Sequence, residues 1–175
     1  MPPQEIDIRT TIEALPEQIY RLLDDSSSWP TWTPIDSFEL IEPAHGDGLG
    51  EVRLFHTGRI TVRERIVERI PNQRLSYVLL GGLAVTQYRA DIDLESCDAG
   101  TSVRWHTTFR PKVPGMGGVY RRALLTATHR FVAGLREATA TRPPRTGEPG
   151  NAPAPQEAEH GRGRLGRWAR GSSRR

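Results

Sequence analysis

The chain has 175 residues, of which 36% are hydrophobic, and a formal net charge of +3. The stretch from Arg142 onward contains eight Arg and three Glu, so residues 1–141 carry a net charge of about −2. A slightly acidic body of this length fits one domain with a substantial core, and it excludes the generally basic surface of a nucleic-acid-binding domain.

The first part of the chain predicts a strand followed by two short helices. Residues 6–12 alternate between apolar or Thr positions and polar ones, which is the period of a half-buried strand. Pro16 suits the first position of a helix, and the serines at 26–28 end that helix. We expect a second short helical turn to carry Trp29 and Trp32.

Six further strands are predicted between residues 38 and 110. The turns that separate them contain Gly, Pro, Asn or Asp and have hairpin size, which predicts an antiparallel meander. On the longest of these strands, Val62, Glu64 and Ile66 share one face. The expected strands are residues 38–41, 51–57, 60–70, 75–80, 85–94 and 101–110.

A long helix and a tail of different composition follow the predicted sheet. Apolar residues such as Tyr120, Leu124 and Phe131 recur every three or four positions and indicate a helix over residues 119–140. Beyond this helix apolar residues almost vanish, so burial cannot offset the entropy cost of ordering the chain. We therefore predict a folded domain over residues 1–141 and a disordered Pro/Gly/Arg-rich basic tail over residues 142–175.

This order of elements predicts an α+β fold with an internal cavity. A strongly twisted antiparallel sheet of about six to seven strands curves, and its concave face needs a cover. The helix over residues 119–140 is the only predicted element long enough to supply that cover. Because a helix laid in a curved sheet tends to leave space beside it, we expect a small-molecule cavity between the two.

Several short motifs occur in a characteristic order and spacing. They are residues 12–20, Trp29-Pro30-Thr31-Trp32, residues 63–67, Leu75-Ser76-Tyr77 and residues 100–105. Together they resemble the START-like, Bet v 1-like superfamily, also called SRPBCC, and especially its polyketide cyclase/dehydrase group. The resemblance covers roughly residues 5–140 and implies the helix-grip fold, which agrees with the cavity inferred above. Members of this superfamily include lipid carriers, ligand sensors and aromatase/cyclases, so the fold does not decide the chemistry.

Six side chains are candidates for binding a ligand in the cavity. They lie on apolar faces, where aromatic rings would form the walls and hydroxyl groups would orient a mainly apolar ligand. The alternative is an ordinary core, in which each hydroxyl group bonds to the backbone. For Trp29 and Phe109 we expect such a structural role. The candidates are Trp32, Tyr77, Tyr88, Trp105, Thr107 and Leu124.

Glu64 and His56 are the candidates for acid–base catalysis. A carboxyl group on an otherwise apolar face has a raised pKa and can move protons. The alternatives for Glu64 are an ion pair with Arg53 or Arg89, or a position that faces outward. His56 is expected at a strand end on the same side as Val52, and its alternative is simple exposure to solvent.

No metal site or cofactor is predicted. The five His are scattered, and the sequence contains no His-Glu-x-x-His or Cys/His cluster and no serine-hydrolase elbow. Cys97 has no partner for an internal disulfide, which suits a reducing cytoplasm. We expect this cysteine at the end of a strand. Because neither a signal peptide nor a membrane span is expected, the predicted location is cytoplasmic.

Three functions are open at this point. The leading hypothesis is binding of a small hydrophobic or aromatic molecule in the cavity. The second is a polyketide cyclase, aromatase or dehydratase that acts in the same cavity, with Glu64, His56 or Tyr77 moving protons. The third is a non-catalytic interaction module whose tail, with arginines around Trp168, makes weak contacts with anionic partners and reads no specific nucleic acid.

Overall fold

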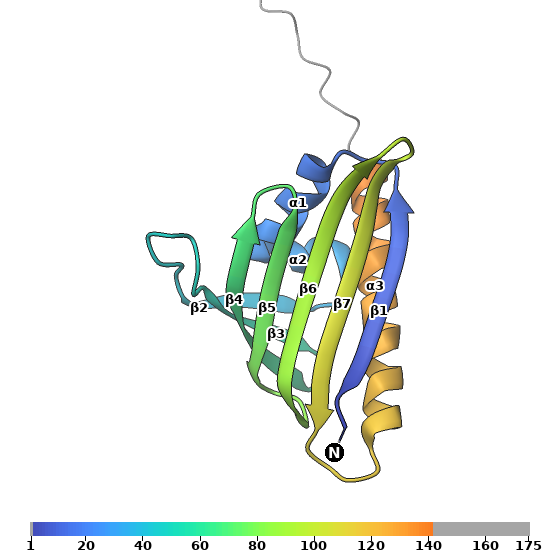
Figure 1. Ribbon diagram of the computed structural model, residues 1–175. Helices are drawn as coiled ribbons and strands as arrows, with labels where there is room; N and C mark the ends of the chain where they lie inside the picture. The colour runs from blue at the N-terminus through green and yellow to red at the C-terminus, as the bar shows by residue number, and fades with distance from the viewer. Residues whose placement is uncertain (1, 142–175) are drawn as a thin grey trace, which may run out of the picture. The chain divides into compact units, whose positions relative to one another are not determined.

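The computed structural model describes residues 2–141, so the predicted tail lies outside the described residues. Seven antiparallel strands form one sheet in the order β1-β7-β6-β5-β4-β3-β2, and a long helix lies against it (Figure 1). The strands are β1 (Gln4–Ile12), β2 (Ser37–Glu42), β3 (Val52–Thr57), β4 (Ile60–Ile70), β5 (Arg74–Gly81), β6 (Val85–Cys97) and β7 (Gly100–Pro111). The helices are α1 (Pro16–Asp24), the 3-10 helix η1 (Ser26–Ser28), α2 (Trp29–Trp32) and α3 (Gly117–Ala140).

The predicted α+β helix-grip architecture is confirmed. Each strand begins and ends within three residues of the bounds expected from the sequence, because hydrophobic alternation and turn residues mark strands and their ends clearly. Cys97 is the exposed last residue of β6, as expected. Among the described residues, no helix combines the length and the apolarity needed to cross a membrane.

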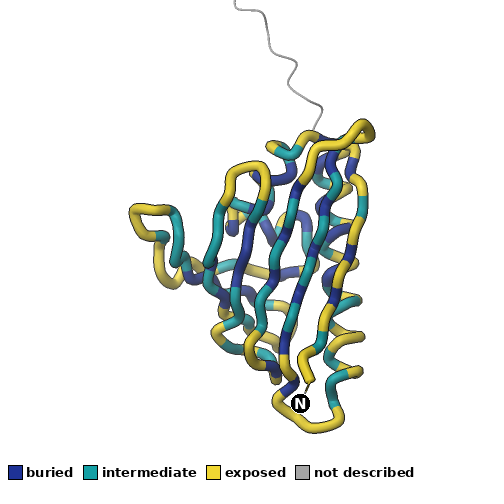
Figure 2. Tube along the Cα trace, viewed as in Figure 1, coloured by how far each residue is buried: buried dark blue, intermediate teal, exposed yellow. Residues whose placement is uncertain are grey.

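The core lies on the concave face of the sheet. Strand pairing places Ile66, Tyr77, Ala90, Thr107 and Ile6 in one row that crosses from β4 to β1, and all five side chains are buried. Neighbouring residues in sequence point to the convex face and are more exposed, so buried and less buried positions alternate along the strands (Figure 2). This alternation aims one set of side chains at α3.

Helix α3 packs closely on the rest of the domain only in its second half. Its buried residues are Thr128, Val132, Leu135 and Thr139, and none precedes Thr128 (Figure 2). Gly134 permits the closest approach, because a Cβ atom at this position would lie 1.7 Å from the carbonyl oxygen of Trp32 in α2. The first half of α3 therefore stands at the open end of the domain without a buried side chain.

Candidate functional site

A row of polar side chains crosses the concave face of the sheet from β4 to β7. Glu64, Tyr77, Tyr88 and Thr107 come from the four successive strands β4, β5, β6 and β7. All except Tyr88 are buried, and Tyr88 is partly exposed. Because cavity sites combine apolar walls with a few converging polar groups, this row is the natural centre of a candidate site.

The row begins with a buried ion pair. The Nε and Nη2 atoms of Arg53 lie 3.1 and 3.0 Å from Oε2 of Glu64, and the Arg53 side chain is fully buried. Burial raises the pKa of the Glu64 carboxyl group, and the charge and hydrogen bond of Arg53 oppose that effect. Glu64 thus faces inward. Its ion-pair partner is Arg53, one of the two arginines that the sequence suggested for this role.

Aromatic rings and a second ion pair fix the position of Arg53. Its guanidinium carbon lies 4.3 Å from the centre of the Trp29 ring and 4.9 Å from that of Tyr77. Its Nη1 donates to Oγ of Ser26 at 3.2 Å, and Ser26 in turn donates to Glu51, which pairs with Arg69. Nε and Nη1 of the guanidinium group therefore donate to protein atoms, whereas Nη2 faces Glu64 as an ion-pair contact without hydrogen-bond geometry.

The two tyrosines continue the row towards β7. Their ring centres lie 6.3 Å apart, and burial is the main cause that raises the pKa of each phenol well above its usual value. Both phenols are therefore neutral near pH 7 and can donate a hydrogen bond. A β-bulge near Gln87, whose φ is 50°, shifts the pairing of β6 with β7, and Tyr88 and Val85 both reach the core on either side of it.

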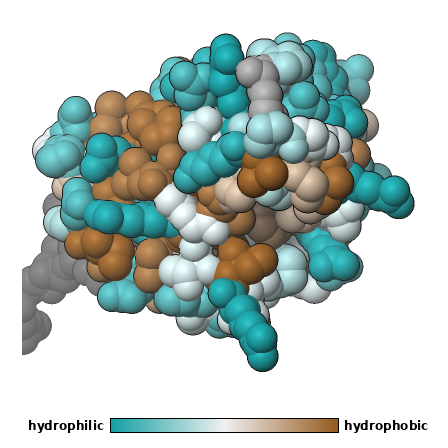
Figure 3. All heavy atoms as spheres, turned by 90° about the horizontal axis from the view of Figure 1, so that it is seen from below, coloured by the Kyte–Doolittle hydropathy of each residue, from teal (hydrophilic) through white to brown (hydrophobic). Residues whose placement is uncertain are grey.

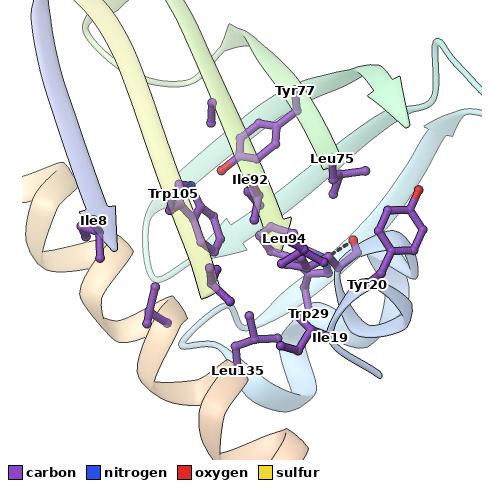
Figure 4. Packing of buried hydrophobic residues seen from close by; sticks show 14 of the residues in the cluster. Ile8, Ile19, Tyr20, Trp29, Leu75, Tyr77, Ile92, Leu94, Trp105 and Leu135 are labelled. Atoms are coloured by element: carbon purple, nitrogen blue, oxygen red, sulfur yellow. Dashed lines mark hydrogen bonds between the residues drawn. The ribbon is translucent and has the colours of Figure 1, made fainter. Parts of the chain in front are cut away.

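Two buried donors at the end of the row make no hydrogen bond of normal geometry among the described residues. They are the indole Nε1 of Trp105 and the hydroxyl group of Thr107, and both residues are 1% exposed. The Thr107 hydroxyl group nevertheless interacts with the phenol of Tyr88, whose pKa it lowers. Figure 4 shows the Tyr77 hydroxyl pointing towards the same part of the interior as the Trp105 nitrogen. Burying a hydrogen-bond donor without an acceptor lowers the stability of the fold by about 1–3 kcal/mol. The presence of two such donors in one core therefore needs an explanation.

Aromatic rings close the interior behind these donors. The ring of Phe131 on α3 lies 5.8 Å from that of Trp105 and 6.1 Å from that of Trp29. Trp29 donates to the carbonyl oxygen of Leu23 at 3.0 Å, which is the structural role expected for it. Trp32 is also buried, and its Nε1 donates to Oγ of Ser28, so it holds α2 in place rather than offering a free donor.

The apolar interior extends towards the end of the domain where α3 begins. Apolar side chains from β5, from the turn between β5 and β6 and from α3 contact the core and are only partly buried at this end, among them Leu79, Leu83, Tyr120 and Leu124. Figure 3 shows this end from below, with hydrophobic residues gathered around a depression. We call this region the mouth, and define it by Leu79, Leu83, Tyr88, Tyr120 and Leu124.

His56 does not join this set. It shares a side of β3 with Val52, as expected, but the side that faces the core carries Arg53 and Phe55. Its Nδ1 lies 3.0 Å from the hydroxyl oxygen of Thr61 on the neighbouring strand. The structure therefore separates the two candidate acid–base residues onto opposite faces of the sheet.

The outcome for the six predicted ligand-binding residues follows from these positions. Tyr77, Trp105 and Thr107 lie together in the interior, Tyr88 and Leu124 border the mouth, and Trp32 packs beside Trp29 at 5.0 Å between ring centres. The sequence suggested Arg53 only as a partner for Glu64, and its central position in the core was not predicted. Within residues 2–141, no group of three or more His, Cys, Asp or Glu is arranged to hold a metal ion.

Comparison with known families settles the classification of the chain. Residues 3–142 match the family described as "Polyketide cyclase / dehydrase and lipid transport". The chain belongs to this family. The suspected membership in the polyketide cyclase/dehydrase group is thereby confirmed. No curated protein matches the chain significantly.

Solved structures share the fold of this family member. XoxI from Bacillus cereus is 25% identical over 80% of this chain and 96% of its own, with a TM-score of 0.64. A START superfamily protein from Mycobacterium smegmatis is 12% identical over 79% of this chain and 97% of its own, with a TM-score of 0.67. The di-domain ARO/CYC protein StfQ from the steffimycin biosynthetic pathway is 13% identical over 79% of this chain, with a TM-score of 0.69, but only 51% of StfQ is covered.

Proposed function

We propose that this family member binds a small, mainly aromatic molecule between the concave face of the sheet and the first half of α3. The observation that carries the proposal is the uneven packing of α3, which buries side chains only from Thr128 onward. Tyr88 supports it further, because this side chain packs against the core and is still partly exposed at the same end of the domain.

The polar groups of the interior specify the ligand more closely. The unpartnered donors of Trp105 and Thr107 call for an acceptor oxygen on the ligand. Arg53, the cation beside the row, already pairs with Glu64, so an anionic ligand would meet no unpaired positive charge there. The chemistry therefore favours a neutral aromatic molecule with a carbonyl or similar oxygen, stacked against the rings of Trp105 and Phe131.

Titration of the full chain with 2-acetylnaphthalene by calorimetry tests this function. We expect saturable binding in the micromolar range to the wild-type protein. Leu124→Trp fills the mouth and should weaken binding at least tenfold, since the added ring occupies the space of the ligand. Leu40→Trp is the matched control on the exposed strand β2 and should bind like wild type. Equal affinity of wild type and Leu124→Trp would contradict a site in the mouth.

A cyclase or dehydratase activity in the same interior is the second candidate. Glu64 faces inward, burial raises its pKa, and its charge acts on both Tyr77 and Tyr88. In an intramolecular aldol condensation, a base removes a proton beside one carbonyl group, the new carbon–carbon bond forms at a second carbonyl carbon, and the oxygen of that carbon takes up a proton to become a hydroxyl group. Removal of a second proton from the attacking carbon then forms the carbon–carbon double bond, and the hydroxyl group takes up a proton and leaves as water. Glu64 is placed to exchange the protons and a tyrosine hydroxyl to donate to the oxygen.

The conversion of 2,6-heptanedione to 3-methylcyclohex-2-enone with loss of water tests this second candidate. If the interior catalyses the reaction, Glu64→Gln should lower the rate at least tenfold, while His56→Gln, changed on the opposite face, should leave it unaltered. A wild-type rate equal to that in buffer would remove the enzymatic hypothesis. A rate that depends on His56 and not on Glu64 would place the reaction on the convex face of the sheet, which contradicts catalysis in the interior.

A further inference from the structure

A separate groove lies between the edge strand β1 and the second half of α3. Its volume is about 290 Å³, and it is lined by residues 8–10 of the strand and by His129, Val132, Ala133 and Arg136 of the helix. The mouth, in contrast, is formed by the first half of α3 together with β5 and β6. The volume approaches that of small-molecule pockets, which begin at about 300 Å³.

The groove joins an apolar floor to a positively charged side chain on its helix side. Ile8 and Val132 contribute buried apolar side chains, and Arg136 contributes the charge. Arg9 on the strand side lies 3.6 Å from the carboxylate of Asp7, so its charge is already paired. None of the lining residues is acidic, which leaves Arg136 as the lining cation without a carboxylate beside it.

Neutral acceptors hold the guanidinium group of Arg136 in place. Its Nη2 donates to Oγ1 of Thr10 at 2.6 Å and to the carbonyl oxygen of Thr11 at 3.3 Å. Among residues 2–141, no carboxylate forms an ion pair with it. An arginine that is oriented by neutral groups keeps its positive charge and its remaining donors for an anion, preferably a planar carboxylate.

The unpaired edge of β1 adds a backbone donor. This strand pairs only with β7, so alternate residues direct their backbone groups away from the sheet. Because the carbonyl group of Thr11 accepts from Arg136, it points to the helix side, and the backbone of Arg9, two residues earlier, points the same way. The N–H group of Arg9 is thus directed at the groove.

From these features we propose that the groove is a second binding site, which takes a small amphipathic carboxylate. The carboxylate contacts Arg136 and the edge of β1, and a short apolar body covers Ile8, Val132 and Ala133. This site does not depend on the proposed interior site, because the two are lined by different residues.

Chemical-shift mapping of the full chain by NMR, with hexanoate as the probe, tests the proposal. We expect saturable shifts at the amide groups of residues 8–10 and 132–136. The uncharged analogue 1-hexanol should bind at least fivefold more weakly, and inorganic phosphate should also bind more weakly because it has no apolar body. Arg136→Gln should weaken hexanoate binding about tenfold. Arg130→Gln is the control, because it removes an exposed charge of the same helix that does not line the groove.

The proposal fails under several distinct outcomes. Equal binding of hexanoate and hexanol would remove the role of charge, and equal binding of phosphate would remove that of the apolar floor. If Arg136→Gln and Arg130→Gln weaken binding alike, the attraction is a general effect of the helix. Shifts confined to Tyr88 and Leu124 would place hexanoate in the mouth, which contradicts the second site but leaves the interior site standing.

Discussion

Arg53 places a charged guanidinium group inside a hydrophobic core. The desolvation cost of this charge must be offset by a partner of opposite charge and suitable geometry. Glu64 supplies the opposite charge, and the rings of Trp29, Phe55 and Tyr77 surround the rest of the group. Breaking a buried pair by removing one partner is far more costly than replacing both, because a lone buried charge remains. This asymmetry yields a test of the pair.

Arg53→Met should lower the unfolding free energy by about 3 kcal/mol or more near pH 7. Without Arg53, the folded-state pKa of Glu64 rises further above its unfolded value of about 4.5. A raised pKa means that the folded state holds the proton more tightly, so the loss of stability should grow as pH rises from about 4.5 to neutral. Urea unfolding at several pH values measures this slope.

The double variant Arg53→Met/Glu64→Leu is the control for that experiment. It removes both charges and should recover much of the lost stability, with no dependence on pH from this position. A single variant as stable as wild type at neutral pH would show that the pair is not enclosed as described.

Thr107→Val should stabilise the empty protein and weaken ligand binding at the same time. The substitution removes a buried hydroxyl group that makes no hydrogen bond of normal geometry, and its interaction with Tyr88 does not offset the cost of burying it, so the unfolding free energy should rise by about 1 kcal/mol. Affinity for 2-acetylnaphthalene should fall about fivefold, while that for 2-ethylnaphthalene, which lacks the oxygen, should not change. Denaturant unfolding and calorimetry measure the two effects, and a loss of stability would mean that the hydroxyl group already has an acceptor.

At the residue scale, the sequence predicted which positions face the interior better than it predicted their contacts. Alternation placed Tyr77, Trp105 and Thr107 on inward faces, because strand period alone decides this. The burial of Arg53 was harder to predict, because an arginine in a strand normally faces solvent. Only the pairing of β3 with β4 brings it opposite Glu64. Ser26, which bonds to Arg53 from the helical segment, carries no sequence signal for that role.

Among the elements, α3 depends on one close contact at Gly134. A helix interior favours Ala over Gly by about 1 kcal/mol, but a Cβ atom here would collide with the backbone of α2. Because a backbone carbonyl group cannot move aside cheaply, the collision should outweigh the helix preference. The contact thus fixes the second half of the helix, whereas the first half contacts the core only through partly buried side chains such as Tyr120 and Leu124.

Gly134→Ala should therefore destabilise the domain by about 3 kcal/mol. Gly118→Ala, in the first turn of the same helix, meets open space and should stabilise it by a few tenths to about 1 kcal/mol. Thermal unfolding of both variants measures the two opposite effects. Similar changes in both would mean that helix propensity, rather than contact with α2, decides the result.

The sequence predicted α3 as an element but not its uneven packing. Tyr120, Leu124 and Leu135 belong to the same hydrophobic period, although only Leu135 is buried. Periodicity shows which face is apolar and not what lies opposite, which depends on the curvature of the sheet. The bulge near Gln87 escaped prediction for a similar reason, because no glycine marks it.

On the scale of the whole domain, the two faces of the sheet have opposite character. The concave face is apolar with one enclosed ion pair, whereas the convex face carries a chain of linked charges that spans β1, β7, β6, β5 and β4. Such surface pairs contribute little singly, but as a network they define how stability responds to acid. The linked residues are Asp7, Arg104, Asp93, Arg74, Glu68, Arg89 and Asp91.

Asp91 should make part of the stability depend on acid. Burial by itself raises the pKa of this carboxyl group, but hydrogen bonds from Arg89 and Ser76 outweigh it and lower the pKa below 3.8. A lowered pKa stabilises the fold above the unfolded value, and that contribution is lost as pH falls through the folded value. The difference in unfolding free energy between wild type and Asp91→Asn should therefore shrink between about pH 5 and pH 2. A constant difference would exclude this role.

The most direct test of the central claim is to locate a bound ligand. Intermolecular nuclear Overhauser effects between 2-acetylnaphthalene and methyl-labelled full-length protein report which side chains surround it. The account predicts contacts from the ring protons to Leu79, Leu83 and Leu124, with the acetyl group near Thr107. Contacts confined to the exposed strand β2 or to the groove beside β1, or no contacts at saturating ligand, would contradict an interior site under the first half of α3.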